Sequence, residues 1–376
     1  MNNKNGVRGG WSTALMMVGC CFALLWGTGC SHTTNPSHPT EKGDRLQRFE
    51  RSGTKFGTPV NLIFYTSNEK DASEAARAAF ELIDQLEYIF SDYQPESEVN
   101  KLCANSDGKT PIKVSDHLFR VLQQAQQVSE SSEGAFDVTI RPVIRLWRRA
   151  INQKQKKLPD PKRLAKAKNL VDYRLVHLDP KDRTVLLEKP GMQLDLGGIS
   201  KGYIIDQVLE LFRKRGINRA LVDIGGDMAM GDPPPEKKGW VVAVAPLEGI
   251  DKAKDHKPFR RLTLSNCAVA TSGDTVRFVE INGQRYSHLI DPRSGIGITD
   301  HSNVTVIAPN ATTADALASA VSILGPEKGL ELIEKTAGVE AMIFRRPVDK
   351  LEVYRSTGFP EGEEGEKKEG GEGRKS

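Results

Sequence analysis

The sequence predicts an α+β fold, and two observations support this prediction. Five segments of strand-like composition follow one another between residues 240 and 290, with no helical pattern between them. A doubly wound parallel sheet would instead need a helix between successive strands. Amphipathic helical patterns gather elsewhere in the chain, and no internal repeat is present. We therefore expect a single domain in which a mixed or antiparallel sheet packs against helices.

The individual elements follow from the spacing of apolar residues. A repeat of 3.6 residues predicts helices at 69–90, 117–131, 200–215, 311–324 and 326–336. Alternating or continuous apolar segments predict strands at 60–65, 175–178, 184–187, 192–196, 219–224, 240–245, 261–264, 268–271, 276–281, 285–290, 303–308, 341–344 and 351–354. Asn282-Gly283 predicts a tight hairpin turn, and residues 179–183 predict a longer hairpin loop.

The segment 191–231 is the centre of the predicted fold. Apolar and polar residues alternate over 192–196, as in a half-buried strand, before Gly197-Gly198 interrupts the chain. We expect Ser200 to cap the following helix. Gly216, placed after three cationic residues, is expected to end it.

A second glycine pair, Gly225-Gly226, ends the strand predicted at 219–224. Glycine lets an anion approach the backbone, and a helix N-terminus presents free N–H groups. The two pairs therefore fit a phosphate or pyrophosphate site, and they fit two tight turns equally well. Neither pair has the glycine spacing of a Rossmann or P-loop motif.

Composition and charge suit a soluble globular protein and give no sign of nucleic-acid binding. The chain has 376 residues, of which 38% are hydrophobic and 6% aromatic, and its net charge is +4. Basic residues occur at both ends, and no RNA-binding or zinc-finger signature is present. The basic run at 151–169 is expected to be a solvated surface.

The N-terminus has the pattern of a bacterial lipoprotein signal peptide over residues 1–30. Lys4 and Arg8 precede an almost uncharged apolar segment, and small residues precede Cys30. Cys30 is therefore the predicted lipidation site. The alternatives are an ordinary signal peptide or an uncleaved membrane anchor, for which the apolar segment is short. A lipid at Cys30 would hold the protein on the outer side of the cytoplasmic membrane, in the periplasm of a Gram-negative host.

The remaining terminal segments have a different composition. Residues 31–50 are polar, contain Pro36 and Pro39, and predict a flexible tether. Residues 360–376 are almost entirely Glu, Lys and Gly and predict a disordered tail. Once the leader is removed, Cys103 and Cys267 are the remaining cysteines, too few for a disulfide framework or a metal cluster. The sequence leaves open whether they pair with each other.

Two short motifs carry residues suited to chemistry. Asp315 and Ser319 lie four residues apart near a predicted helix N-terminus, so their oxygens face the same side. They suit a hard cation such as Mg²⁺, or Asp315 simply complements the helix dipole while Ser319 packs. His288 lies at a strand end before a proline turn and suits a general base. The alternative for His288 is an exposed histidine in an ordinary turn.

Five motifs, in this order and spacing, resemble those of the ApbE family of FAD:protein FMN transferases. They are AFDVT at 135–139, LDLGGISKGY at 194–203, VDIGGD at 222–227, SHLIDPRSG at 287–295 and VTVIAPNATTADALASA at 304–320. The resemblance implies a T-fold-like α+β domain, FAD as substrate and a required Mg²⁺. It also implies cleavage of the FAD pyrophosphate, transfer of FMN through a phosphoester to a Thr or Ser of a target flavoprotein, and release of AMP.

The resemblance also implies the roles of particular residues. The implied metal ligands are the backbone carbonyl of Gly198 and the side chains of Asp315 and Ser319, and His288 is the implied catalytic residue. The implied FAD contacts are Phe56, Tyr93, Ala135, Phe136, Asp137, Asp195, Lys201 and Ile290. The chain departs from some relatives at three positions: Ala318 replaces an acidic ligand, Lys201 replaces an acidic residue, and Phe56 replaces a methionine.

The sequence thus predicts one catalytic domain at 51–359, between the tether and the tail. Its expected partners are FAD, a target flavoprotein and a membrane reached through the lipid. Two other functions fit the same features. One is a Mg²⁺-dependent FAD pyrophosphatase that gives FMN and AMP, and the other is a lipid-tethered flavin-binding protein without turnover.

Overall fold

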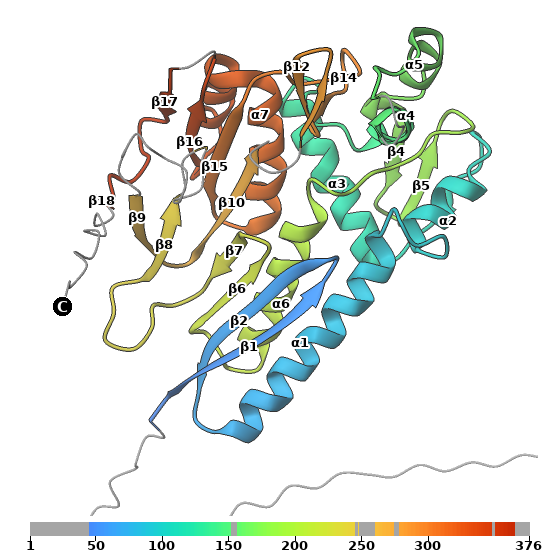
Figure 1. Cartoon of the computed structure of the whole chain (residues 1–376). Helices are drawn as coiled ribbons and strands as arrows, with labels where there is room; N and C mark the ends of the chain where they lie inside the picture. Colours follow the sequence, from blue (N-terminus) through green and yellow to red (C-terminus); the bar gives the residue numbers. More distant parts are fainter. Residues whose placement is uncertain are drawn as a thin grey trace, which may run out of the picture. The chain divides into compact units, whose positions relative to one another are not determined.

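An eight-stranded antiparallel sheet forms the centre of the structure (Figure 1). The structure is a computed structural model that describes residues 45–151, 156–244, 247, 260–273, 278–347 and 350–364. Every strand pairing within these residues is antiparallel. In order across the central sheet, the strands are β1 (Gln47–Lys55), β2 (Thr58–Thr66), β6 (Ala220–Ile224), β7 (Asp227–Met230), β10 (Cys267–Gly273), β15 (Ser302–Ala308), β16 (Glu340–Arg345) and β17 (Glu352–Arg355).

The helices α1, α6 and α7 cover one face of this sheet and bury the main apolar core against it. The helices are α1 (Glu69–Phe90), α2 (Glu98–Asn105), α3 (Asp116–Ser131), α4 (Arg141–Ile151), α5 (Pro161–Lys168), α6 (Ser200–Lys214) and α7 (Ala311–Glu334), with short 3₁₀ turns η1 (Val138–Ile140) and η2 (Tyr173–Leu175). α1 packs on β1 and β2, α6 on β6 and β7, and α7 on β10, β15 and β16. Side chains from these helices and from alternate strand positions form one continuous cluster.

The opposite face of the sheet is covered by a second, three-stranded sheet. It consists of β8 (Trp240–Val244), β9 (Arg260–Leu264) and β18 (Glu363–Glu364). Trp240 and Val242 pack in a separate cluster with Leu221, Met230 and Ile307 of the central sheet. Because both of its faces are covered, β15 is buried at every residue.

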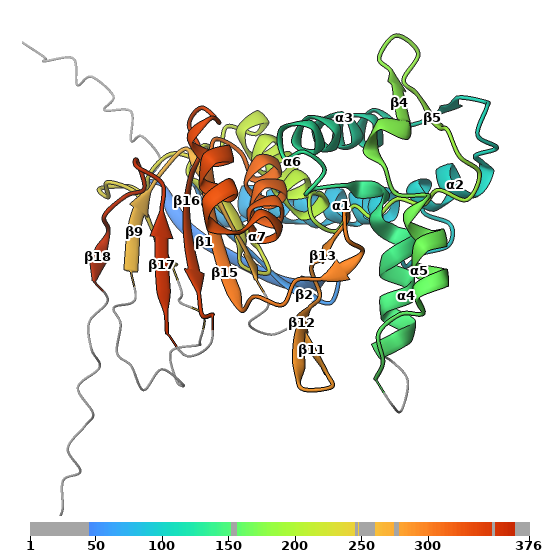
Figure 2. The ribbon, with the colours of Figure 1, turned by 90° about the horizontal axis from the view of Figure 1, so that it is seen from above.

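Smaller sheets lie beside the helices. One contains β3 (Ile112–Lys113), β4 (Val176–Asp179) and β5 (Thr184–Leu187); the others are the pairs β11 (Phe278–Ile281) with β12 (Gln284–Ser287), and β13 (Ile290–Asp291) with β14 (Ile296–Gly297). The two pairs lie near α4 and α5 in Figure 2. Trp147 of α4 contacts both pairs: its Nε1 donates a hydrogen bond to the carbonyl of Gly295 at 2.9 Å, and its ring centre lies 5.6 Å from that of Tyr286 in β12.

The structure confirms the α+β prediction and corrects two local expectations. Residues 192–196 alternate in burial as expected but form no strand. Their backbone groups instead bond to a 3₁₀ turn and a thiol: Asp195 N donates to the carbonyl of Val138 in η1 at 2.7 Å, and Leu194 N donates to Cys103 Sγ at 3.3 Å. Ser200 is not the helix cap, because α6 begins at this residue and the preceding Ile199 makes no side-chain cap bond.

The terminal predictions are corrected where the structure reaches them. β1 begins at Gln47, within the stretch 31–50 expected to be a tether, and β18 pairs with β9 within the tail expected at 360–376. Residues 1–44, including Cys30, and residues 365–376 lie outside the described residues. Both Cys103 and Cys267 are free thiols. Within the described part of the chain, no helix is both long and apolar enough to cross a membrane.

Candidate active site

The candidate site forms where the start of α6 meets the start of α7. The two segments run antiparallel, with Gly198 against Ser319, Gly202 against Asp315 and Ala311, and Asp206 against Ala311. A Cβ at Gly202 would overlap the carbonyl of Ala311, so only glycine permits this approach. The close crossing places backbone of α6 directly beside side chains of α7.

This crossing brings the three predicted metal ligands together. Asp315 Oδ2 accepts a hydrogen bond from Gly202 N at 3.1 Å. A Cβ built on Gly198 would lie 3.1 Å from Ser319 Oγ, so the Gly198 backbone and this hydroxyl are neighbours. Within the described residues, Asp315 Oδ1 accepts no hydrogen bond, which leaves it available as a ligand. A carboxylate, a hydroxyl and a backbone segment are the hard oxygen donors that Mg²⁺ prefers.

The donor set fits a metal that keeps water or substrate oxygens. No group of three or more His, Cys, Asp or Glu side chains among the described residues is placed to hold a metal ion. Mg²⁺ commonly binds through one or two carboxylates and completes its coordination with water and phosphate oxygens. A single carboxylate beside a hydroxyl therefore suits Mg²⁺ and does not suit a structural zinc site.

A substitution at Gly202 tests the crossing. Gly202→Ala is expected to lower the free energy of unfolding by about 3 kcal/mol, because the added methyl forces two backbones apart. Gly216→Ala is the matched control: φ there is 77° and nothing lies within 4 Å of an added Cβ. This control should cost only about 1 kcal/mol, from backbone strain alone. Urea unfolding measures both, and equal losses would contradict the close crossing.

The start of α7 is held by two side chains. Asp206 of α6 accepts hydrogen bonds from Ala311 N and Thr312 N, both at 2.8 Å, and from Thr312 Oγ1 at 2.5 Å. Asn310 Oδ1 accepts from Thr313 N at 2.8 Å. The free N–H groups of the first turn are thereby satisfied within the protein. This helix end serves to position Asp315 and is not open to a phosphate.

Burial and nearby charge make the Asp315 environment favourable for a cation. Asp315 is only 6% exposed. Burial raises its pKa to about 7; the Lys201 ammonium opposes this rise and the Asp227 carboxylate reinforces it. Lys201 forms an ion pair with Asp227, whose second oxygen accepts from Thr271 N at 3.1 Å. A bound cation would favour the ionised form of Asp315 and so oppose the effect of burial.

The motif at 135–137 contacts the predicted metal ligands through Phe136, which lies beside Gly198. Phe136 is buried, and its Cε2 lies 3.2 Å from the position of a Cβ on Gly198. Ala135 is fully buried beside it in the chain. Asp137 points into local hydrogen bonds instead, accepting from Thr139 N at 2.8 Å and Tyr173 N at 2.9 Å. The Asp137 side chain therefore fixes the loop that carries Phe136.

Tyr93 and Asp195 both contact Arg148 of α4. The Arg148 guanidinium lies 4.8 Å from the centre of the Tyr93 ring. Its Nη2 is 3.5 Å from Asp195 Oδ2, and its Nη1 is 2.8 Å from Asp92 Oδ2. The described contacts thus connect two predicted FAD contacts through a residue that the sequence analysis did not select.

The other predicted residues lie in separate packing environments. Phe56 is in the β1–β2 turn at a φ of 55° and packs partly on the main core. Ile290 is buried in the small cluster around α4 and β11. His288 follows β12 and is exposed. Gly225-Gly226, one of the two glycine pairs, forms the β6–β7 hairpin turn. Within the described residues, no hydrogen bond joins Phe56, Ile290 or the Gly225-Gly226 turn to Asp315.

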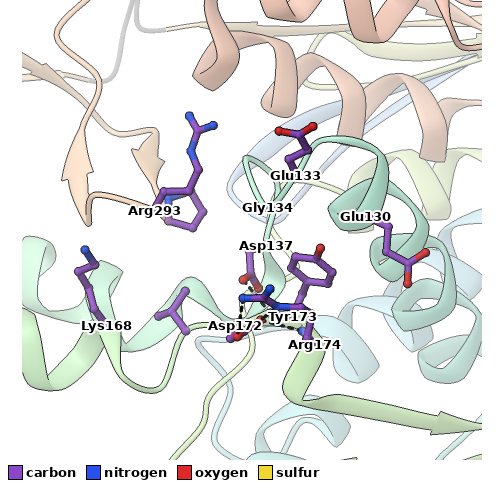
Figure 3. Close-up of a pocket in the computed structure, with 11 residues that line it drawn as sticks. Glu130, Glu133, Gly134, Asp137, Lys168, Asp172, Tyr173, Arg174 and Arg293 are labelled. Carbon is purple, nitrogen blue, oxygen red and sulfur yellow. Dashed lines mark hydrogen bonds and ion pairs between the residues drawn. The ribbon is translucent and has the colours of Figure 1, made fainter.

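Two cavities border the site without containing Asp315. One, of about 380 Å³, lies between the end of α3, residues 168–174 and the turn at 292–293 (Figure 3). Two of its arginines are engaged in ion pairs, Arg174 with Asp172 and Arg293 with Asp291, both at 2.8 Å. The other, of about 700 Å³, lies between α3 and α6 and reaches Asp206. Neither cavity identifies a ligand.

Sequence reasoning missed Asp206, Asp227 and Arg148 as parts of this region. Asp227 stands in the motif VDIGGD, and Arg148 stands in a run of cations after Trp147. Neither pattern predicts which residue forms the ion pair, because the contacts join separate segments of the chain. Asp206 is 106 residues from Thr312, for example. Only the fold brings such pairs together.

Comparison with known proteins identifies the family of this chain. The ApbE family profile matches residues 56–343. A protein of Treponema pallidum named FAD:protein FMN transferase is 33% identical over 80% of this chain and 85% of its own length. A Haemophilus influenzae protein of the same name is 31% identical over 78% and 86%. The crystal structure of the Pseudomonas stutzeri flavinyl transferase ApbE, apo form, superposes with a TM-score of 0.73 at 26% identity, covering 83% of this chain and 95% of that one. The chain therefore belongs to the ApbE family.

Proposed function

We propose that this protein is a Mg²⁺-dependent FAD:protein FMN transferase. It would cleave FAD, attach FMN through a phosphoester to a Thr or Ser of a target flavoprotein, and release AMP. The observation that carries the proposal is the meeting of Asp315, Ser319 and Gly198 beside Phe136 at the α6–α7 crossing. The names of the related proteins support the same activity.

The proposed chemistry assigns a distinct task to each part of the site. Asp315, Ser319 and the Gly198 carbonyl would hold the Mg²⁺, which supplies charge neutralisation at the pyrophosphate and at the leaving AMP. Asp206 fixes the helix that carries Asp315. His288 would take the proton of the acceptor hydroxyl, and its exposed position suits a partner that is itself a protein.

The proposed FAD contacts combine buried and exposed surfaces. Tyr93 is 76% exposed and offers an aromatic face for a flat ring, whereas Phe136 is buried beside Gly198. Lys201, already paired with Asp227, brings a cation near the proposed phosphate position. FAD would thus lie between an aromatic surface and the metal-ligand group.

One experiment separates the transferase from its two alternatives. Purified protein is mixed with FAD and Mg²⁺, with and without a candidate flavoprotein that contains an acceptor Thr, and AMP is quantified. AMP that appears only with the acceptor, together with fluorescent acceptor on a denaturing gel, supports the transferase. Abundant AMP without any acceptor identifies a pyrophosphatase. FAD binding with no AMP under either condition identifies a binding protein.

We also propose that a lipid on Cys30 anchors the protein outside the cytoplasmic membrane. Cys30→Ala is expected to move the protein from the membrane fraction to the soluble fraction, or to leave an unprocessed precursor, because no thiol remains to be acylated. Cell fractionation and the mass of the mature chain measure this. Cys21→Ala is the matched control and should behave as wild type. Unchanged processing and membrane partition of Cys30→Ala would contradict the anchor.

A further inference from the structure

Arg148 joins three segments at the edge of the candidate site. Its guanidinium contacts Asp92 in the loop after α1, at 2.8 Å, and Asp195 in the segment before α6, at 3.5 Å. Its central carbon also lies 4.8 Å from the centre of the Tyr93 ring. One side chain thus contacts two carboxylates and one aromatic ring.

Arg141 and Asn100 hold the loop that carries Asp92 and Tyr93 through further contacts. The side chains of Asp92 and Asp195 are only 11% and 12% exposed. Asp92 lies 4.0 Å from Arg141 Nε, and Arg141 also donates hydrogen bonds to the Asp92 carbonyl and to Asn100. Asn100 in turn donates to the carbonyl of Gln94 at 2.6 Å. The loop backbone is therefore fixed independently of Arg148.

The contacts of Arg141 and Asn100 hold the loop backbone, and the Tyr93 side chain is mostly exposed. It is 76% exposed, whereas the Arg148 side chain that faces it is 38% exposed. A planar guanidinium can stack on an aromatic ring and bond two carboxylates at once, which an ammonium cannot do. Arg148 also holds two like charges, Asp92 and Asp195, close to one another. Without it, the ring would rotate freely and the carboxylates would repel.

We propose that Arg148 is a positioning residue for FAD, which fixes the Tyr93 ring and the Asp195 carboxylate in one binding arrangement. The inference rests on the proposed function, because Tyr93 and Asp195 are expected to contact FAD only if the protein is the proposed transferase. A preformed arrangement improves affinity because less side-chain freedom is lost on binding. Arg148 therefore acts on FAD affinity and leaves the transfer step unchanged.

The test measures the Kd of FAD by fluorescence titration, and the kcat of Mg²⁺-dependent AMP release at saturating FAD in the presence of the acceptor protein. Arg148→Ala is expected to raise the Kd about tenfold, which corresponds to about 1.4 kcal/mol, and to leave kcat close to that of wild type. Arg148→Lys keeps the charge and should recover part of the affinity. Arg149→Ala, an exposed arginine on the same helix, is the matched control and should change neither constant.

A double-mutant cycle with Tyr93→Ala distinguishes positioning from general destabilisation. If Arg148 acts through the ring, Tyr93→Ala should weaken FAD binding much less in the Arg148→Ala background than in wild type. Additive effects, or a wild-type Kd for Arg148→Ala, would overturn the inference. If Arg148→Ala does not fold, Arg148→Lys and Arg148→Gln enter the same cycle. Wild-type protein that neither binds FAD nor releases AMP would instead refute the proposed function.

Discussion

Replacing Asp315 with alanine is expected to abolish Mg²⁺-dependent release of AMP from FAD at ordinary Mg²⁺ concentrations. Asp315 is the one carboxylate in the proposed ligand set, and it both coordinates the cation and offsets its charge. Burial raises the pKa of Asp315 to about 7, and a bound cation would favour the ionised form of this carboxyl. The measurement is the rate of AMP release from FAD in the presence of the acceptor protein, followed against Mg²⁺ concentration.

Ser319→Ala is the companion variant and should be partly rescued by raised Mg²⁺, because it removes a neutral ligand. Asp315→Asn separates charge from shape, since an amide oxygen can still accept the hydrogen bond from Gly202 N. We expect it to remain inactive. Thermal unfolding should show that all three variants fold. Wild-type turnover with wild-type Mg²⁺ dependence in Asp315→Ala would show that Asp315 only complements the helix dipole.

His288→Asn is expected to retain FAD affinity and to lose FMN transfer by about 10²–10⁴-fold. A general base contributes in the transition state, so its loss lowers kcat more than it weakens binding. Because His288 is exposed, the substitution should leave the fold intact. The measurements are FAD titration and the rate of flavin attachment to the acceptor protein.

His177→Asn is the control for the histidine variant. His177 is an exposed histidine of β4, hydrogen bonded to Glu188 at 2.8 Å, and no proposed step uses it. It should transfer FMN at the wild-type rate. If His288→Asn weakens FAD binding as much as it slows transfer, His288 is a binding residue and another group is the base.

Local periodicity predicted much of the fold, and failed where an element depends on its neighbours. The helix expected at 69–90 matches α1, because its apolar residues repeat on one side over six turns of a long amphipathic pattern. β1 escaped prediction because it is an edge strand in which Phe49 is the only buried residue. Residues 192–196 alternate as a strand does, but the fold provides them with no partner strand.

The site was predictable only as far as its residues share a helix turn or a motif. Asp315 and Ser319 are four residues apart on α7, so their common side follows from helix geometry. The hydrogen bonds of Asp206 to the start of α7 and the ion pair of Arg148 with Asp195 join segments from different parts of the chain. Acidic and basic residues are abundant in this sequence, and local pattern does not select which of them meet. Those contacts follow from the helix crossing and from the position of α4.

The helix crossing also has a thermodynamic consequence. The hydrogen bond between Gly202 N and Asp315 joins residues 113 apart in the sequence, so the crossing that brings Gly198 close to Ser319 does not exist in the unfolded chain. A cation bound there is bound to the native state alone, and mass action then adds its binding free energy to the free energy of unfolding. At a free concentration 100 times the Kd, this addition is about 2.7 kcal/mol. If Mg²⁺ binds there as proposed, the unfolding temperature of the protein would rise with the Mg²⁺ concentration.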